Sequence, residues 1–458
     1  MARQPTTRLH VSGYRFLVRR MEHALLRGDI TMLHPVRAQS ISFVAGCVIA
    51  VVIVAVCAIL AFVRPNTPIG GSAIVMSRQS GALYVRVDDT LHPVENLTSA
   101  RLIAGSTADP QLVNEANIDN AKRGPLLGIA GAPAVIGKPL AQRESAWTIC
   151  DDTTTTLIAG GADQFEERDR DSSILVTARS ESAAMTYLLY DGQRAEVDLR
   201  SPGVVWALRL DGIEPRPVPR TLLDAVPEAP PIVAPLIPEA GTPGAVAGLA
   251  VGTVVRVERD SADDFFVVLA DGVQPIGETA ANLIRSLDSQ GSREIRPVSP
   301  DVVASVPVVR TLQVSTYPRR AIVPVGARDG GVLCAGWLPD GPKTFVWMDD
   351  SSSDAVSAAL LAQADGDGPK VDRVVMPAGR SAYVRAVSLG GQGGDSGPLY
   401  LVTDGGVLYG IRDKDTAEML GVEGDPVAAP WPLLARLPRG PEIDRDAALL
   451  ARDGIAPP

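Results

Sequence analysis

Histidine and cysteine are scarce in this chain of 458 residues, which contains four of each. Three of the histidines precede position 41, so His92 is the only one in the long remainder. A structural zinc site takes four ligands, and a serine-protease triad needs a histidine oriented by an aspartate. No general acid, general base or metal cluster stands out among the carboxylates. We therefore expect no catalytic residues, no metal site and no cofactor.

The run GGDSGP at residues 393–398 is similar to the segment around the nucleophile of trypsin-like proteases, with Ser396 in the nucleophile's place. Those enzymes have a second Gly where Pro398 stands, and proline has no N–H to donate to an oxyanion. His92 lies far upstream, directly after a different repeated segment. We therefore interpret Ser396 as a serine in the loop before the segment YLVTDG.

A phosphate-binding P-loop is also missing. The nearest run is GAPAVIGKPL at residues 131–140, in which five residues separate Gly131 from Gly137 where the motif has four. Pro139 follows Lys138 at the place where the motif needs a hydroxyl for magnesium. ATP hydrolysis stays an alternative function, with no Walker motif behind it.

A charge-free apolar run fills positions 41–63. As a helix that rises about 1.5 Å per residue, it can span a hydrocarbon core of roughly 30 Å. A cleaved signal sequence has a shorter apolar stretch, roughly 7–15 residues, behind a short basic region. Here the long segment 1–40 precedes the run, so we predict an uncleaved single transmembrane helix.

Charge is distributed unevenly about this helix. Residues 1–40 contain seven Arg against Glu22 and Asp29, a net charge of +5, which leaves −15 for the remainder. Only Arg64 and Arg78 follow within twenty residues of the span. By the positive-inside rule, the N-terminus is cytoplasmic and everything after the span is exported.

The basic arm, residues 1–40, has the pattern of an amphipathic helix over residues 12–28, with Ser12 as its N-cap. A generic basic flank that sets topology and touches anionic lipid explains its charge but not its apolar side chains. We therefore favour docking to cytoplasmic partner subunits. The docking residues that we propose are Arg15, Phe16, Leu17, Arg19, Arg20 and Met21.

The four cysteines divide between membrane and exported part. Cys47 and Cys57 lie in the apolar run, where they act as small apolar residues. Cys150 and Cys334 are left in an oxidising compartment, and a zinc site would need two further ligands. We predict that these two form a disulfide.

The exported part contains internal repeats. YLLYDG at 187–192 matches YLVTDG at 400–405, and each reads as strand, tight turn and strand. Downstream, residues 218–232 match residues 429–443 at an offset of 211, with a Leu pair between prolines that predicts a short helix. YVRVDD at 84–89 and FVVLADG at 266–272 are two further copies, followed by the similar segments SARLIAG and AANLIRS.

These repeats predict a β-rich α+β exported domain, elongated, with four repeat units around a central β core and pseudo-two-fold symmetry. The predicted boundaries after the span are 64–120 for repeat unit 1, 121–180 for a core segment with Cys150, 181–235 for repeat unit 2, 236–244 for a Pro/Gly linker, 245–315 for repeat unit 3, 316–380 for a core segment with Cys334, and 381–458 for repeat unit 4 and the C-terminal tail.

The chain resembles the EccB family, a membrane component of the type VII (ESX) secretion systems of mycobacteria and related actinobacteria. The likeness rests on the arm TTRLHVSGYRFLVRRMEHALLRGD, on SGALYVRVDD, LLGIAGAP, QADGDGP, YLVTDGGV and PWPLLARLPRGPEI, and on the two exported cysteines. His34 departs from the family pattern, which usually has an acidic residue there.

The resemblance implies a structural subunit of an inner-membrane export complex, assembled with EccC, EccD and EccE. It also implies an exported, periplasmic domain that associates with copies of itself, and substrates of the WXG100, PE and PPE kinds. No nucleic-acid partner is expected. The family often carries an ATPase label, which the absence of a P-loop leaves without support in the residues.

A third class of function is a cell-wall or carbohydrate-binding module. The small repeated β units and the tryptophans of the exported part favour it, although scattered tryptophans are usually core or interface residues. The tryptophans concerned are Trp147, Trp206, Trp337, Trp347 and Trp431.

Overall fold

The structure is a computed structural model. It describes residues 8–27, 34–62, 70–152, 154–161, 172–179, 185–259, 263–291, 293–340, 343–349, 358–394 and 396–452. The chain divides into two compact units, Met1–Gly70 and Gly71–Pro458, of which we call the second the β-rich unit.

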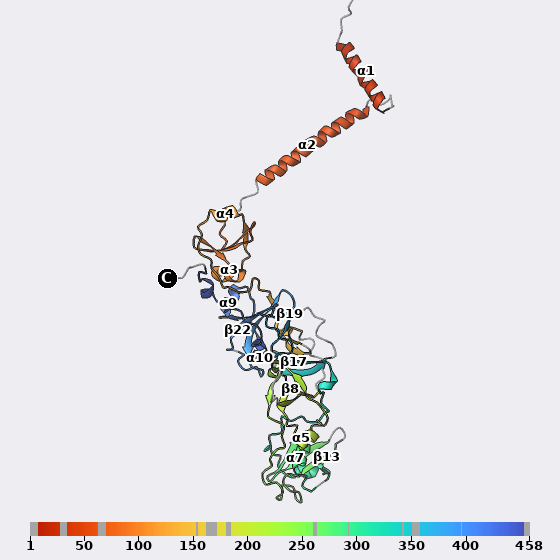
Figure 1. The fold of residues 1–458 in the computed structure, drawn as a ribbon, viewed down its shortest axis with the longest axis vertical. Helices are drawn as coiled ribbons and strands as arrows, with labels where there is room; N and C mark the ends of the chain where they lie inside the picture. The colour runs from red at the N-terminus through yellow and green to blue at the C-terminus, as the bar shows by residue number, and fades with distance from the viewer. Residues whose placement is uncertain are drawn as a thin grey trace, which may run out of the picture. The chain divides into compact units, whose positions relative to one another are not determined.

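The described residues of the first unit form two helices, α1 (Arg8–Arg27) and α2 (His34–Phe62) (Figure 1). The prediction that Ser12 caps the first helix is wrong, because no Gly or Pro interrupts residues 8–12 and the helix continues upstream to Arg8. Helix α2 likewise begins before the predicted span, since proline is tolerated in a first turn. Its segment Ser40–Ile59 is long and apolar enough to cross a membrane.

Within its described residues, the β-rich unit contains four small sheets that share an arrangement of four strands, to which the second and fourth sheets each add a fifth strand. In each, three strands form an antiparallel meander, and a later strand returns parallel to the first strand of the meander. The first sheet has the order β3-β2-β1-β4 and contains β1 (Ile74–Ser77), β2 (Leu83–Val87), β3 (Thr90–Val94) and β4 (Gln111–Val113). The second has the order β11-β8-β9-β10-β12 and contains β8 (Ile174–Ala178), β9 (Thr186–Tyr190), β10 (Gln193–Glu196), β11 (Arg216–Val218) and β12 (Glu228–Ala229).

The other two small sheets repeat this arrangement. The third has the order β15-β14-β13-β16 and contains β13 (Val254–Val257), β14 (Asp264–Val268), β15 (Val273–Ile276) and β16 (Arg296–Pro297). The fourth has the order β23-β22-β21-β24 and contains β21 (Arg380–Val387), β22 (Leu399–Thr403), β23 (Leu408–Ile411) and β24 (Val427–Pro430), with β5 (Lys138–Pro139) also paired to β21.

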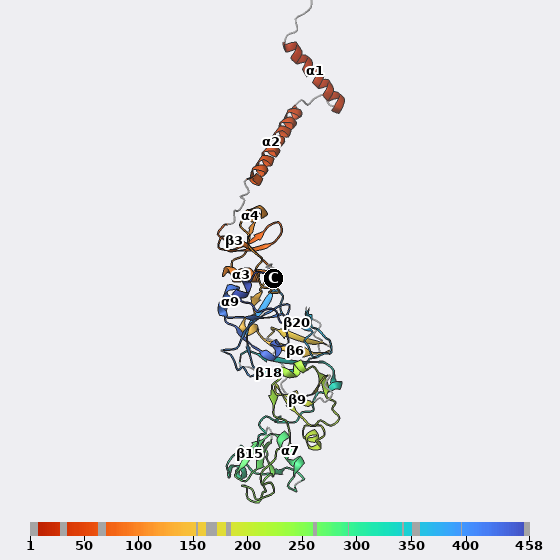
Figure 2. The same ribbon diagram turned by 60° about the vertical axis from the view of Figure 1, so that its left-hand side comes forward.

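A fifth, six-stranded sheet joins segments far apart in the sequence, and Figure 2 shows its strands β6, β18 and β20 in one region. Its order is β18-β17-β6-β7-β20-β19, and its strands are β6 (Trp147–Asp151), β7 (Thr155–Ala159), β17 (Val332–Leu338), β18 (Lys343–Asp349), β19 (Ala359–Leu360) and β20 (Arg373–Val375). Strands β6 and β17 are almost entirely buried, so they carry apolar residues without alternation.

Short helices join these sheets in pairs. Helix α3 (Leu97–Ala104) packs against α9 (Lys414–Met419) and α11 (Arg445–Ala448), α5 (Pro202–Ala207) against α7 (Glu278–Leu287), and α6 (Arg220–Asp224) against α10 (Trp431–Leu434). The remaining short elements are α4 (Glu115–Asp119), η1 (Gln142–Glu144), α8 (Pro300–Ala304) and η3 (Ala327–Asp329). Each helix pair buries a continuous apolar core between two sheets.

The four predicted hairpins are confirmed as β2–β3, β9–β10, β14–β15 and β22–β23. The turn after β9 places Asp191 and Gly192 at φ 48° and 72°, the left-handed conformation that Asp-Gly supplies in a two-residue hairpin. The two helices predicted around the Leu pairs are α6 and α10.

Candidate functional site

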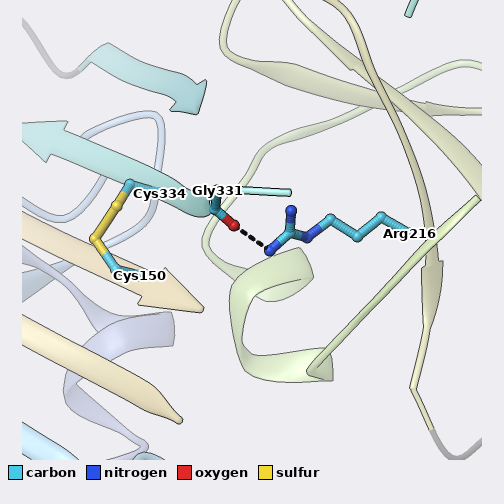
Figure 3. Close-up of a disulfide and its surroundings, with 4 residues drawn as sticks. All are labelled: Cys150, Arg216, Gly331 and Cys334. Atoms are coloured by element: carbon cyan, nitrogen blue, oxygen red, sulfur yellow. Dashed lines mark hydrogen bonds between the residues drawn. A yellow bond between two sulfur atoms is a disulfide. The ribbon is translucent and has the colours of Figure 1, made fainter. Parts of the chain in front are cut away.

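The predicted disulfide is confirmed and lies in the middle of the six-stranded sheet (Figure 3). Cys150 on β6 and Cys334 on β17 are directly opposite each other in an antiparallel pair, and both are buried. The same register places Trp147 opposite Trp337. The disulfide therefore closes a loop of 184 residues at a place where two strands are already neighbours.

Arg216 connects this sheet to the second small sheet. Its guanidinium donates one hydrogen bond of 2.6 Å to the carbonyl of Gly331 (Figure 3). A second, of 3.0 Å, goes to the carbonyl of Gly330. Both glycines have positive φ, so the chain turns sharply just before β17 and presents the two carbonyls together. A forked, planar cation suits two adjacent acceptors, whereas a lysine would reach only one at a time.

A buried ion pair lies beside the disulfide. Arg179 Nη2 is 2.7 Å from Asp151 Oδ2, and the Asp151 side chain is only 1% exposed. Burial raises the pKa of the Asp151 carboxyl to about 6, although the Arg179 and Arg216 guanidiniums oppose this rise. Asp151 belongs to β6 and Arg179 follows β8, so the pair joins two sheets.

The motif QADGDGP and the aspartate that follows it form a second connection. Buried Asp372 accepts hydrogen bonds from the backbone N–H groups of Thr155, Asp365 and Gly366, at 2.7–2.8 Å. Gln363 donates to the carbonyl of Arg436, just after α10, at 2.6 Å. The sequence analysis did not predict the hydrogen bonds of Asp372 and Gln363. The pattern that could have indicated Asp372 is an aspartate between a Gly-rich turn and a β-prone run.

The three motifs that were weighed for catalysis lie in separate structural settings. Ser396 lies in the loop before β22, where its backbone N–H donates a hydrogen bond to the carbonyl of Gly393. The His92 ring is 3.1 Å from the carbonyl of Pro125. Lys138 is a residue of β5, and its carbonyl accepts a hydrogen bond from Arg380. No group of three or more metal-ligating side chains forms within the described part of the chain.

On α1, the proposed docking residues are exposed, but they do not share one face. Leu17 and Met21 are four residues apart and lie on one stripe, whereas Phe16 lies about 100° around the helix from Leu17. Arg15 and Arg19 form a further stripe.

Comparison with known proteins shows end-to-end similarity. The family described as "Type VII secretion system ESX-1, transport TM domain B" matches residues 3–457. The ESX-3 secretion system ATPase EccB3 of Mycolicibacterium smegmatis is 36% identical over 98% of this chain and 91% of its own length. The ESX-2 secretion system ATPase EccB2 of Mycobacterium tuberculosis H37Rv is 34% identical over 97% of this chain and 94% of its own length.

Solved structures are similar too. A chain in the structure of an intact ESX-5 inner membrane complex has a TM-score of 0.70 and 30% identity, covering 100% of this chain and 98% of that chain. A chain of the EccB3 dimer from the ESX-3 core complex has a TM-score of 0.70 and 33% identity, covering 83% of this chain and 100% of that chain.

Proposed function

This chain belongs to the EccB family of type VII (ESX) secretion proteins, and from that premise we propose that it is a structural subunit of an inner-membrane ESX secretion complex. The observation that carries the proposal is the full-length similarity to a chain of an intact ESX-5 inner membrane complex. The subunit anchors itself through α2 and organises the complex through the β-rich unit.

The contacts between sheets fit a part that acts by rigid geometry. Four features hold together segments from distant parts of the sequence. They are the six-stranded sheet, the disulfide, the Asp151–Arg179 ion pair and the two hydrogen bonds that Arg216 donates to Gly330 and Gly331, which we call the Arg216 fork. A subunit that holds neighbours at fixed positions needs this resistance to deformation.

We extend the proposal to four repeat units related by a pseudo-two-fold axis. Its support is the shared strand order of the four small sheets and the matching of helices. In the repeat alignment, α3 is equivalent to α7 and α5 is equivalent to α9. The two helix contacts correspond in the same way, since α3 packs on α9 and its equivalent α7 packs on α5. The equivalent helices α6 and α10 pack on each other, as elements beside a two-fold axis would.

For topology, we propose that α1 is cytoplasmic and the β-rich unit periplasmic. The excess of Arg before the span supports this orientation. The partners are the membrane subunits EccC, EccD and EccE, and α1 docks to them on the cytoplasmic side through its exposed apolar and basic side chains. The β-rich unit associates with further copies of itself, as the dimeric EccB3 structure illustrates for that relative.

The names of the relatives contain the word ATPase, but we propose no site for ATP hydrolysis in this chain. Lys138 lies on a strand that pairs with β21, and a Cβ at Gly137 would collide with the carbonyl of Gly379, so this glycine serves close backbone packing. Purified full-length protein and its Lys138→Ala variant should show the same ATP turnover, indistinguishable from a buffer control. Hydrolysis that disappears in the variant would restore the alternative.

The main test is affinity purification of the tagged full-length chain from detergent-solubilised membranes of its own host. We expect EccC, EccD, EccE and untagged copies of this chain to co-purify in fixed ratios. A chain that elutes alone, as a monomer, contradicts the proposal. Labelling by a membrane-impermeant maleimide tests orientation: in a Cys47→Ala, Cys57→Ala background, Leu236→Cys should react in spheroplasts and Ser12→Cys only after lysis.

A further inference from the structure

The structure sorts the five tryptophans of the β-rich unit into two groups. Trp206 on α5 is 58% exposed. The others are buried or packed on neighbouring side chains: Trp147, Trp337, Trp347 and Trp431. Trp431 stacks on Tyr400 at 5.4 Å. An indole that is left largely exposed beside a groove is a feature of binding surfaces, since folding normally buries so large an apolar ring.

Trp206 lines a shallow groove of about 360 Å³ where α5 meets α7. The other lining residues are Pro202, Gly203, Arg285, Ser286 and Arg293. The floor is fixed, because buried residues on the inner sides of both helices belong to one apolar core. A Cβ at Gly203 would collide with the Ser286 hydroxyl, so only glycine lets the two helices approach this closely.

The groove is cationic within an acidic body. Arg285 and Arg293 line it, and no Asp or Glu among the residues that the structure describes does so. Arg285 donates a 2.7 Å hydrogen bond to the carbonyl of Arg293 and so fixes the segment that carries the second guanidinium. The Arg293 guanidinium has no hydrogen bond or ion pair with any residue in the described ranges. The residues beyond position 40 carry a net charge of −15, so this cationic groove contrasts with the body around it.

The junction of α3 with α9 provides an internal comparison. Its groove, about 490 Å³, is lined by Arg101, Glu418 and Glu423 among others. Arg101 is occupied there, since it donates to the carbonyl of Leu420 at 3.1 Å and lies 3.7 Å from Asp109. The cationic character and the exposed indole therefore belong to the α5–α7 groove and not to helix junctions of this chain in general.

We propose that the α5–α7 groove binds a peptidoglycan fragment, in which a sugar ring carries a stem peptide with free carboxylates. The exposed indole face of Trp206 packs on the apolar face of a sugar ring, and Arg293 pairs with a carboxylate through charge-assisted hydrogen bonds. The size of the groove suits one or two sugar rings. A helical peptide would need a longer apolar groove, and an extended peptide would need a free strand edge.

This inference depends only on the exported position of the β-rich unit, so co-purification with secretion subunits can succeed while glycan binding fails, and the reverse. The test uses the full chain in lipid nanodiscs, because sugar-based detergents would compete for the groove. The probe is a fluorescein-labelled disaccharide-tripeptide from peptidoglycan with free carboxylates, followed by fluorescence anisotropy. Its carboxyl-amidated form is the matched ligand control.

We expect the wild-type chain to bind the acidic probe and Trp206→Ala and Arg293→Gln each to weaken binding roughly tenfold, which corresponds to about 1.4 kcal/mol. Amidation of the probe should weaken binding to a similar degree. Arg328→Gln, at an exposed arginine on another surface, should change affinity less than twofold. Circular dichroism checks that each variant is folded.

The proposal would be overturned by no binding of the wild type at millimolar probe, by equal affinity in the wild type and both groove variants, or by equal binding of the amidated probe. A hexaglutamate peptide that competes as well as the unlabelled glycan fragment would also overturn it, in favour of an acidic peptide ligand.

Discussion

The guanidinium of Arg179 lies 2.7 Å from the carboxylate of Asp151, inside the protein and one residue from the disulfide-bonded Cys150. One partner ends a strand of the six-stranded sheet, and the other follows a strand of the second small sheet. The ion pair, the disulfide and the Arg216 fork thus meet at one joint between two sheets.

Asp151 should make stability depend on pH. Its pKa is raised from 3.8 to about 6 on folding, so the unfolded chain loses this proton first as the pH rises. The contribution of Asp151 to the free energy of unfolding is therefore fully present below about pH 4 and decreases as the pH rises to about 6. The total decrease is about 3 kcal/mol, because each pKa unit of the shift corresponds to ~1.4 kcal/mol. Denaturant unfolding of the full-length protein and of Asp151→Asn at pH 4, 5, 6 and 7 measures the difference. A difference that is constant with pH contradicts the assignment.

The disulfide should be complete in the native protein. Thiol titration of the full-length chain in denaturant should find two free thiols, those of Cys47 and Cys57, and four after reduction. The double variant Cys150→Ser, Cys334→Ser should lose about 2–5 kcal/mol of unfolding free energy, because the unfolded chain gains the entropy of an open loop of 184 residues. Four thiols before reduction would disprove the pairing.

Arg216→Ala should lower the unfolding free energy by about 1–3 kcal/mol, because two backbone carbonyls lose a charged donor. Arg216→Lys should recover only part of this loss, since an ammonium cannot fork between them. The matched control is Arg200→Ala, at a highly exposed pair with Asp198, where we expect no measurable change in the unfolding free energy. Equal effects at both arginines would show that Arg216 is an ordinary surface residue.

The docking proposal for α1 can be tested separately for the apolar stripe of Leu17 and Met21 and for the basic stripe of Arg15 and Arg19. The double variant Leu17→Ser, Met21→Ser should abolish co-purification of EccC, EccD and EccE while membrane insertion is retained, because both side chains lie on one exposed apolar stripe. Arg15→Gln with Arg19→Gln tests the basic stripe separately. Unchanged co-purification in both variants, with normal insertion, would leave the arm as a topology signal only.

Local features of the fold were predictable, and so was one long-range contact. The Asp-Gly turn at residue 191 and the proline-bounded Leu pairs are visible in short sequence segments, because each depends on nearby residues. The pairing of Cys150 with Cys334, which are 184 residues apart, followed from counting the cysteines after the apolar run. The order β17-β6-β7-β20 is not visible, since buried strands lack alternation and their register depends on partners in a distant part of the sequence.

The same limit applies to the candidate sites. The exposed Trp206 could not be told from the buried tryptophans by sequence, because Trp206 and Trp337 both have apolar neighbours along the chain. The Asp372 bonds to three amides also depend on a fold that brings residues 155 and 365 together. The failed N-cap at Ser12 has a local cause, since upstream residues were able to continue the helix.

The interleaved order of the six-stranded sheet has a consequence for the synthesis of the protein. Strands β6 and β7 emerge from the ribosome early, but their outer neighbours β17 and β20 lie after residue 330, so both early strands have open edges until most of the chain has been synthesised. Open edges invite pairing with other chains. A premature stop between β7 and β17 would therefore leave an aggregation-prone fragment with an unpaired Cys150. In the full chain, the disulfide between Cys150 and Cys334 can form only late in folding, after β17 has been synthesised.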